Sequence, residues 1–109
     1  MEFLNKIELV GVVGYATEKT DGGATVGLSL SVMTEYVCLD PGGNSVVTVH
    51  WHLVQAHPSV VKDSLDDIEK GTWVKVTGRL EYKKFISSEG EEQRTAIIVA
   101  KEIEVLKKN

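Results

Sequence analysis

The chain has 109 residues, 42% of them hydrophobic and 26% charged, which is enough for one compact core and excludes two independently stable domains. A single cysteine, Cys38, excludes an internal disulfide framework, and the lack of any long apolar run excludes a membrane span or a signal peptide. The formal net charge of −4 speaks against a broadly basic surface, although acids gather in two short stretches, over residues 63–67 and 89–92. We therefore expect one cytoplasmic domain over residues 1–109, with a disordered end at 107–109 and no membrane partner.

Period-two alternation of aliphatic and β-branched residues, broken by glycine turns, predicts a protein made mostly of strands. The first strand is expected at about residues 5–15, where Gly11 and Gly14 permit a bulge or a sharp coil. After a turn at residues 20–23, a second strand over 24–33 places apolar and small polar side chains on opposite faces. We assign its apolar face to the core: Val26, Leu28, Leu30 and Val32.

A loop at residues 40–44 precedes the third strand, which is expected over 45–56. The one short helix is expected between the third and fourth strands. Pro58 begins it, apolar residues recur at helical spacing, and Lys70-Gly71 supplies a cation and a stop.

The fourth strand, at about residues 72–85, alternates an apolar face with a face that carries cations and aromatic rings. The second face holds Trp73, Lys75, Thr77, Arg79, Lys83 and Phe85. A hairpin at residues 87–90 leads to the fifth strand, over 93–106. Because the fifth strand is apolar on both faces, it indicates either barrel closure or a subunit interface.

Five strands with one short helix between the third and fourth are typical of the OB-fold. This is an all-β, five-stranded Greek-key barrel that binds oligonucleotides on one face. Small β-sandwiches and SH3-like barrels show much of the same alternation, so the pattern alone leaves those folds open.

No set of residues typical of catalysis is present. The sequence has no GxxxxGK[ST] loop, no HExxH and no GxSxG, and Cys38 has no flanking signature of a nucleophile. His50 and His52 project to one strand face and could hold zinc together with His57, but no cysteine or carboxylate is spaced to complete four ligands. We favour packing or interface roles for the histidines, and we expect no enzyme activity, no cofactor and no metal.

Aromatic and basic side chains suit single-stranded nucleic acid, because bases stack on rings while Lys and Arg follow the phosphates. Tyr36 ends the second strand, Trp51 lies in the third, and Phe85 lies at the outer end of the fourth beside Lys83 and Lys84. The alternative is structural, since Trp51 shares its parity with apolar neighbours and would then belong to the core, while Phe85 would cap a hairpin.

An ordered set of short motifs over about residues 5–106 resembles the bacterial single-stranded DNA-binding proteins. The motifs are Asn5-Lys6, Leu9-Val10-Gly11, Gly14, Gly22-Gly23-Ala24, Leu28-Ser29-Leu30, Thr34-Glu35-Tyr36, Trp51-His52, Lys70-Gly71, Val74-Lys75-Val76-Thr77-Gly78-Arg79-Leu80, and Lys83-Lys84-Phe85 before Gly90. The resemblance implies an OB-fold that forms a homo-oligomer, a tetramer or a dimer, and wraps single-stranded DNA over aromatic and basic residues.

The resemblance also implies roles for individual side chains. The rings that would stack on bases are Tyr36, Trp51 and Phe85. The lysines that would contact phosphates are Lys83 and Lys84, and the histidine at the subunit interface would be His52. Lys75 and Arg79, which share the cationic face of the fourth strand, are expected to contact DNA as well.

Several positions depart from the family pattern. Leu53 stands where a basic residue is usual, His57 stands where a further stacking Phe is common, and the acids at residues 89–92 would repel phosphates. The linker and acidic tail that recruit replication proteins in the family are missing, so this is either a tail-less relative or a shortened sequence.

We therefore expect sequence-tolerant binding of single-stranded DNA in replication, recombination or repair, in a cytoplasmic, nucleoid-associated protein with replication proteins as further partners. Two alternatives stay open. One is a tail-less, primosomal-type OB adaptor with modest DNA affinity, and the other is a structural oligomerisation module whose sheet faces are consumed by self-association.

Overall fold

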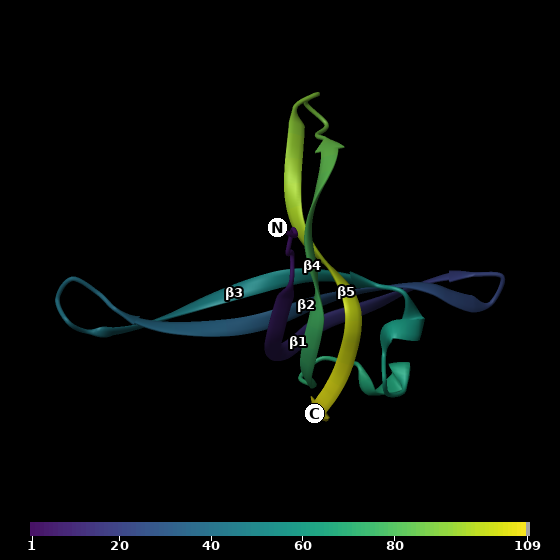
Figure 1. Cartoon of the computed structure of the whole chain (residues 1–109), viewed down its shortest axis with the longest axis horizontal. Coiled ribbons are helices and arrows are strands. Elements are labelled where there is room, and N and C mark those ends of the chain that lie inside the picture. The colour runs from purple at the N-terminus through teal and green to yellow at the C-terminus, as the bar shows by residue number, and fades with distance from the viewer. Residues whose placement is uncertain (109) are drawn as a thin grey trace.

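The computed structural model describes residues 1–108, and its five strands close into a barrel in the order β1-β2-β3-β5-β4 (Figure 1). The strands are β1 (Ile7–Asp21), β2 (Ala24–Leu39), β3 (Ser45–Ala56), β4 (Trp73–Ile86) and β5 (Glu92–Lys107). All neighbours pair antiparallel except β3 and β5, which close the barrel through a short parallel contact at Val54–Ile98 and Gln55–Val99. The all-β, five-stranded barrel predicted from the sequence is confirmed.

The core follows the predicted alternation except at Val26, which was assigned to the core but is exposed, because β2 pairs with β3 only from Leu28 onward and Val26 lies beyond that pairing, near the tip of the β1–β2 hairpin. On β2, Leu28, Leu30 and Val32 are buried, while the intervening serines face the other side of the sheet. The other strands contribute their own inward positions to the same core: Val13, Val54, Val74, Val76, Ile98, Ala100 and Ile103. Ile97 is also buried although it lies outside this core cluster, so β5 is covered on both faces near the barrel closure.

Three hairpins project from the barrel. The β1–β2, β2–β3 and β4–β5 hairpins point in different directions, and the β2–β3 hairpin reaches farthest to one side (Figure 1). We call the last two the β2–β3 arm (residues 34–50) and the β4–β5 arm (residues 82–96). The first two strands run longer than the predicted 5–15 and 24–33, since β1 continues past an irregularity between Val13 and Tyr15.

The segment between β3 and β4 corrects the prediction of one short α-helix. It contains two separate 3-10 turns, η1 (Pro58–Val60) and η2 (Leu65–Asp67). The residues between the turns are bound to β5 instead of to a helix: the Lys62 N–H donates to the Ile103 carbonyl at 3.0 Å, and the Val105 N–H donates to the Asp63 carboxylate at 3.0 Å. The first bond uses the Lys62 N–H, which a continuous helix would need for its own ladder, and the second holds the Asp63 side chain against β5.

Among residues 1–108, none of the helical segments has the length and apolar character required to cross a bilayer. The disordered end expected at residues 107–109 falls partly, at Asn109, outside the described residues, and Lys107 is the last residue of β5.

Candidate nucleic-acid interface

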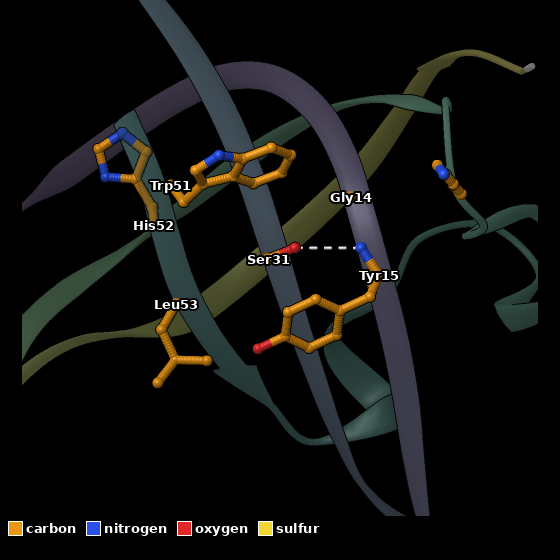
Figure 2. A pocket seen from close by; sticks show the side chains of 7 residues that line it. Gly14, Tyr15, Ser31, Trp51, His52 and Leu53 are labelled. Carbon is orange, nitrogen blue, oxygen red and sulfur yellow. Dashed lines mark hydrogen bonds between the residues drawn. The ribbon is translucent and has the colours of Figure 1, made fainter. Parts of the chain in front are cut away.

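The outward face of β1, β2 and β3 forms a hollowed surface beside the core. The register places Tyr15 opposite Ser31 and Ser31 opposite Leu53, all three pointing away from the buried Leu30 and Val54. A pocket of about 460 Å³ lies here, lined by Gly14, Tyr15, Ser31, Trp51, His52, Leu53 and Lys70 (Figure 2). We call it the aromatic pocket.

Trp51 lies on the outward face although it shares its parity with apolar neighbours. The side chain is 59% exposed, so the structural alternative that placed Trp51 in the core is wrong. The indole is held against β1 because residue 14 has no side chain. A Cβ at Gly14 would lie 2.2 Å from Cζ3 of Trp51. The glycine therefore lets the ring rest on the sheet while part of it stays open to solvent.

Tyr15 is a second aromatic side chain of the aromatic pocket, and it was not among the predicted site residues. The phenol ring and the indole lie on either side of the Ser31 hydroxyl (Figure 2), which accepts a hydrogen bond from the Tyr15 N–H at 3.0 Å. Sequence reasoning missed Tyr15 because it placed the end of the first strand there. The available signal was Gly14, whose bulge lets the strand continue and turns the next side chain outward.

A second hollow continues the same face toward the β4–β5 arm. It has a volume of about 340 Å³ and is lined by Thr17, Lys19, Gly27, Leu28, Ser29, Gln55, Ala56 and Lys83. On each of the three strands, the residue that lines this hollow lies two positions, or roughly 7 Å, beyond the one that lines the aromatic pocket. The residues concerned are Thr17, Ser29 and Gln55. The Nζ of Lys83 donates to Oε1 of Gln55 at 2.6 Å, so β4 brings a cation over β3. We call the two hollows together the groove: it has an aromatic end and a cationic end.

Phe85 and Lys84 lie on opposite sides of the β4–β5 arm. Phe85 is two residues beyond Lys83 and so shares its side, and it is partly exposed. Lys84 points to the other side and forms an ion pair with Glu92 at 3.4 Å. The structure therefore brings Trp51, Lys83 and Phe85 to one side of the molecule and turns Lys84 away from it.

Two other predicted cations are bound to acids outside the groove. Arg79 donates to the Glu81 carboxylate at 2.6 Å, and Lys75 pairs with Glu8 at 3.1 Å. The hydrogen bond and the charge of Lys75 hold the pKa of the Glu8 carboxyl below its usual value. Neither cation lines either hollow of the groove.

Tyr36 lies on the β2–β3 arm, where it pairs with Thr48. Because Trp51 is three positions from Thr48 along β3, the alternation of the strand places Tyr36 and Trp51 on opposite faces of the arm. Tyr36 is well exposed, but the structure does not bring it together with Trp51.

His52 and His57 have separate hydrogen-bond partners. His52 is half-buried, and its Nε2 lies 2.8 Å from Oγ1 of Thr34. Burial, and secondarily the neighbouring His50, lower the pKa of His52. His57 caps η1 by accepting the Ser59 N–H at 3.1 Å. Within residues 1–108, no cluster of three His, Cys, Asp or Glu side chains could hold a metal ion.

Comparison with known proteins matches this chain to one family. The model of the Single-strand binding protein family matches residues 4–106. Among curated relatives, the "Single-stranded DNA-binding protein" of Xylella fastidiosa (strain Temecula1) is 30% identical over 94% of this chain, and that of Xanthomonas axonopodis pv. citri is also 30% identical over 94%. The chain spans 63% and 58% of the length of these two relatives.

Solved structures match the fold closely. A deletion variant of the single-stranded DNA binding protein from Thermus aquaticus superposes with a TM-score of 0.78 at 25% identity, covering 95% of this chain and 51% of that one. A Plasmodium falciparum SSB in complex with ssDNA superposes with a TM-score of 0.77 at 23% identity, covering 97% of both chains. These neighbours confirm the OB-fold.

Proposed function

This chain belongs to the single-strand binding protein family, and from this membership we propose that it is a non-catalytic domain that binds single-stranded DNA with little sequence preference. The observation that carries the proposal is the groove, where the exposed indole of Trp51 and the amino group of Lys83 lie on one side of the barrel. Unpaired bases stack on the aromatic end, and phosphates are attracted to Lys19 and Lys83 at the cationic end.

Single strands are preferred over duplex because only an unpaired base can offer a free π face to Trp51. The net charge of −4 and the acids at residues 89–92 oppose phosphates, so affinity relies on stacking more than it does in a strongly basic binder. Phe85 extends the stacking surface along the β4–β5 arm on the side of Lys83. We assign the domain to DNA replication, recombination or repair, in the cytoplasm with the nucleoid.

The protein is also proposed to work as a homo-oligomer, a dimer or a tetramer, with His52 at the interface. Support comes from apolar side chains left exposed on the outer surface of the barrel, at Val10, Trp73 and Leu106, because contiguous apolar patches usually mark interaction sites. Light scattering at increasing concentration should give the mass of an assembly, and a strict monomer at all concentrations would contradict this part of the proposal.

The adaptor alternative keeps one observation in its favour. The β2–β3 arm, over residues 34–50, has no Lys or Arg, and it exposes Val37, Leu39, Val47 and Val49 on the face that Trp51 shares. Such an arm has no cationic side chain to attract phosphates, and its apolar face suits a protein partner, for example a replication protein.

The deciding experiment is a titration of tryptophan fluorescence in a Trp73→Phe variant, so that the signal comes from Trp51 alone. The probe is a mixed-sequence single strand of roughly 35 nucleotides, longer than the about 4–16 nucleotides that one OB-fold covers. We expect quenching that weakens with salt and little response to duplex of the same sequence. No response at low salt would reject direct binding and favour the adaptor.

A further inference from the structure

We propose that Tyr15 and Trp51 form the two walls of a pocket that takes one unpaired base, whose edge is bonded by the Ser31 hydroxyl. This inference rests on the proposed function and assigns Tyr15 a contact to DNA that sequence reasoning did not foresee. It concerns the aromatic pocket, whose volume of about 460 Å³ falls within the roughly 300–1,000 Å³ of small-ligand sites.

The two rings extend over β2 from opposite strands. Trp51 projects from β3 toward Gly14, and Tyr15 projects from β1, so that β2 runs between their backbones (Figure 2). Within residues 1–108 the only ring pair in contact is His50 with His52, so Trp51 and Tyr15 do not stack on each other. Tyr15 is 49% exposed and Trp51 59%, which leaves surface of each ring for a ligand.

Ser31 supplies a polar group at the floor between the rings. The residue is 6% exposed, and its oxygen accepts the Tyr15 N–H, so its own hydroxyl proton remains able to donate. All four bases carry a carbonyl oxygen or a ring nitrogen that can accept such a bond. The floor therefore fits a base edge without selecting one base, in agreement with sequence-tolerant binding.

The contact proposed for Tyr15 is to a base and not to a phosphate. A neutral phenol ring stacks on bases, whereas the cations are separate side chains: Lys70 lines the same pocket, and Lys19 and Lys83 line the neighbouring hollow. Removing the Tyr15 ring should therefore weaken the contact to the base and leave the attraction of the phosphates unchanged.

The test compares Tyr15→Ala and Tyr15→Phe with a matched control, Tyr82→Ala. Tyr82 is also an exposed strand tyrosine, but it shares the inward parity of Leu80 on β4 and does not line the aromatic pocket. The probes are a mixed-sequence single strand and an abasic strand of the same length. We expect Tyr15→Ala to weaken binding of the normal strand about five- to a hundredfold, the value of one base stack. Tyr15→Phe, which keeps the ring, and Tyr82→Ala should stay close to the unchanged protein.

The abasic strand separates a base contact from a merely structural role. If Tyr15 holds a base, Tyr15→Ala should bind the abasic strand as well as the unchanged protein does, with the same salt slope. Equal losses on both strands, or no loss on the normal strand, would overturn the base pocket while leaving the proposed function intact. A failure of the unchanged protein to bind the normal strand at low salt would instead reject the proposed function itself.

Discussion

Gly14 shows how a single residue determines where a functional side chain can lie. A Cβ at this position would come within 2.2 Å of Cζ3 of Trp51 and 2.7 Å of Oγ of Ser31. Heavy atoms repel strongly at such separations, since carbon contacts are optimal at about 3.5–4.0 Å. The far end of the indole is the part that can move, so a larger residue at position 14 displaces the ring rather than the sheet.

We expect Gly14→Ala to fold and yet to bind single-stranded DNA more weakly, because Trp51 is pushed out of its place in the pocket. The loss should approach the about 1–3 kcal/mol of one base stack. The measurement is the fluorescence titration in the Trp73→Phe background. The control is Gly42→Ala, whose Cβ would meet only ordinary contacts at 3.4 Å. Unchanged affinity and an unchanged Trp51 emission in Gly14→Ala would contradict the role given to Gly14.

His52 makes stability depend on pH through its environment. Its pKa in the folded protein lies below the ordinary value of 6.5, chiefly because burial disfavours the charged ring. The unfolded chain therefore takes up a proton before the folded chain does. Stability is fully present above that ordinary value and is lost as the pH falls through it.

Thermal unfolding of the unchanged protein should thus shift to lower temperature between about pH 7 and pH 5.5. His52→Gln, which keeps a polar partner for Thr34 but does not titrate, should flatten this part of the curve. Glu8 contributes in a more acidic range. Because the pKa of Glu8 in the folded protein is lowered, its contribution to stability is lost only as the pH falls below the ordinary value of 4.5. If the unfolding temperatures of the unchanged protein and of His52→Gln fall equally between about pH 7 and pH 5.5, His52 is not responsible for the pH dependence.

The β4–β5 arm divides two adjacent lysines between its two faces. Lys83 points toward the groove and bonds to the neutral Gln55, so its charge is not cancelled by its partner. Lys84 points the other way and is paired with Glu92. At the scale of one strand, alternation thus separates a cation that can meet phosphates from one that is already bound to an acid.

Lys83→Ala should lower the salt dependence of single-strand binding by about 0.7 in the slope of log affinity against log salt, the amount for one lost phosphate contact. Lys84→Ala should leave the slope nearly unchanged. Both slopes come from titrations at four or more salt concentrations. Equal reductions in the two variants would mean that phosphates follow both faces of the arm, contrary to the proposed path.

The whole molecule is held together by one core that all five strands share. Leu30 is fully buried at its centre, with Val54 opposite on β3, whereas the arms extend beyond this core and expose their side chains. The stability of the barrel and the shape of the groove are therefore separable: the first depends on inward positions, and the second on the outward ones between them.

Leu30→Ala should lower the free energy of unfolding by about 2–5 kcal/mol, because it leaves a cavity in the shared core. Val37→Ala, on the exposed β2–β3 arm, should change it by no more than about 0.5 kcal/mol. Urea unfolding followed by circular dichroism measures both. A large effect of Val37→Ala would show instead that the arm is packed against another surface, such as a second copy of the chain.

Some features of this protein could be predicted from the sequence because they depend on neighbours along the chain. The alternation of Leu28, Leu30 and Val32 on β2, and of Val74 and Val76 on β4, specifies strands with one buried face. The order of turns and strands, together with motifs such as Trp51-His52, pointed to the OB-fold and to the family. These signals are local in sequence, so no knowledge of distant contacts is required to find them.

Tertiary structure alone decided the rest, because period-two alternation states which residues share a face but not what that face meets. Parity left open whether Trp51 stacks on bases or belongs to the core, and the tertiary structure places it on the outward face over Gly14. The ion pairs that occupy Lys75 and Arg79 join them to acids that the alternation did not single out. The segment between β3 and β4 forms two 3-10 turns instead of the expected helix because the Lys62 N–H and the Asp63 carboxylate bond to β5, some 40 residues later in the chain. Tyr15 lines the aromatic pocket because a bulge between Val13 and Tyr15 changes which side chains of β1 point outward. Such a bulge can be located only once the partner strand is known.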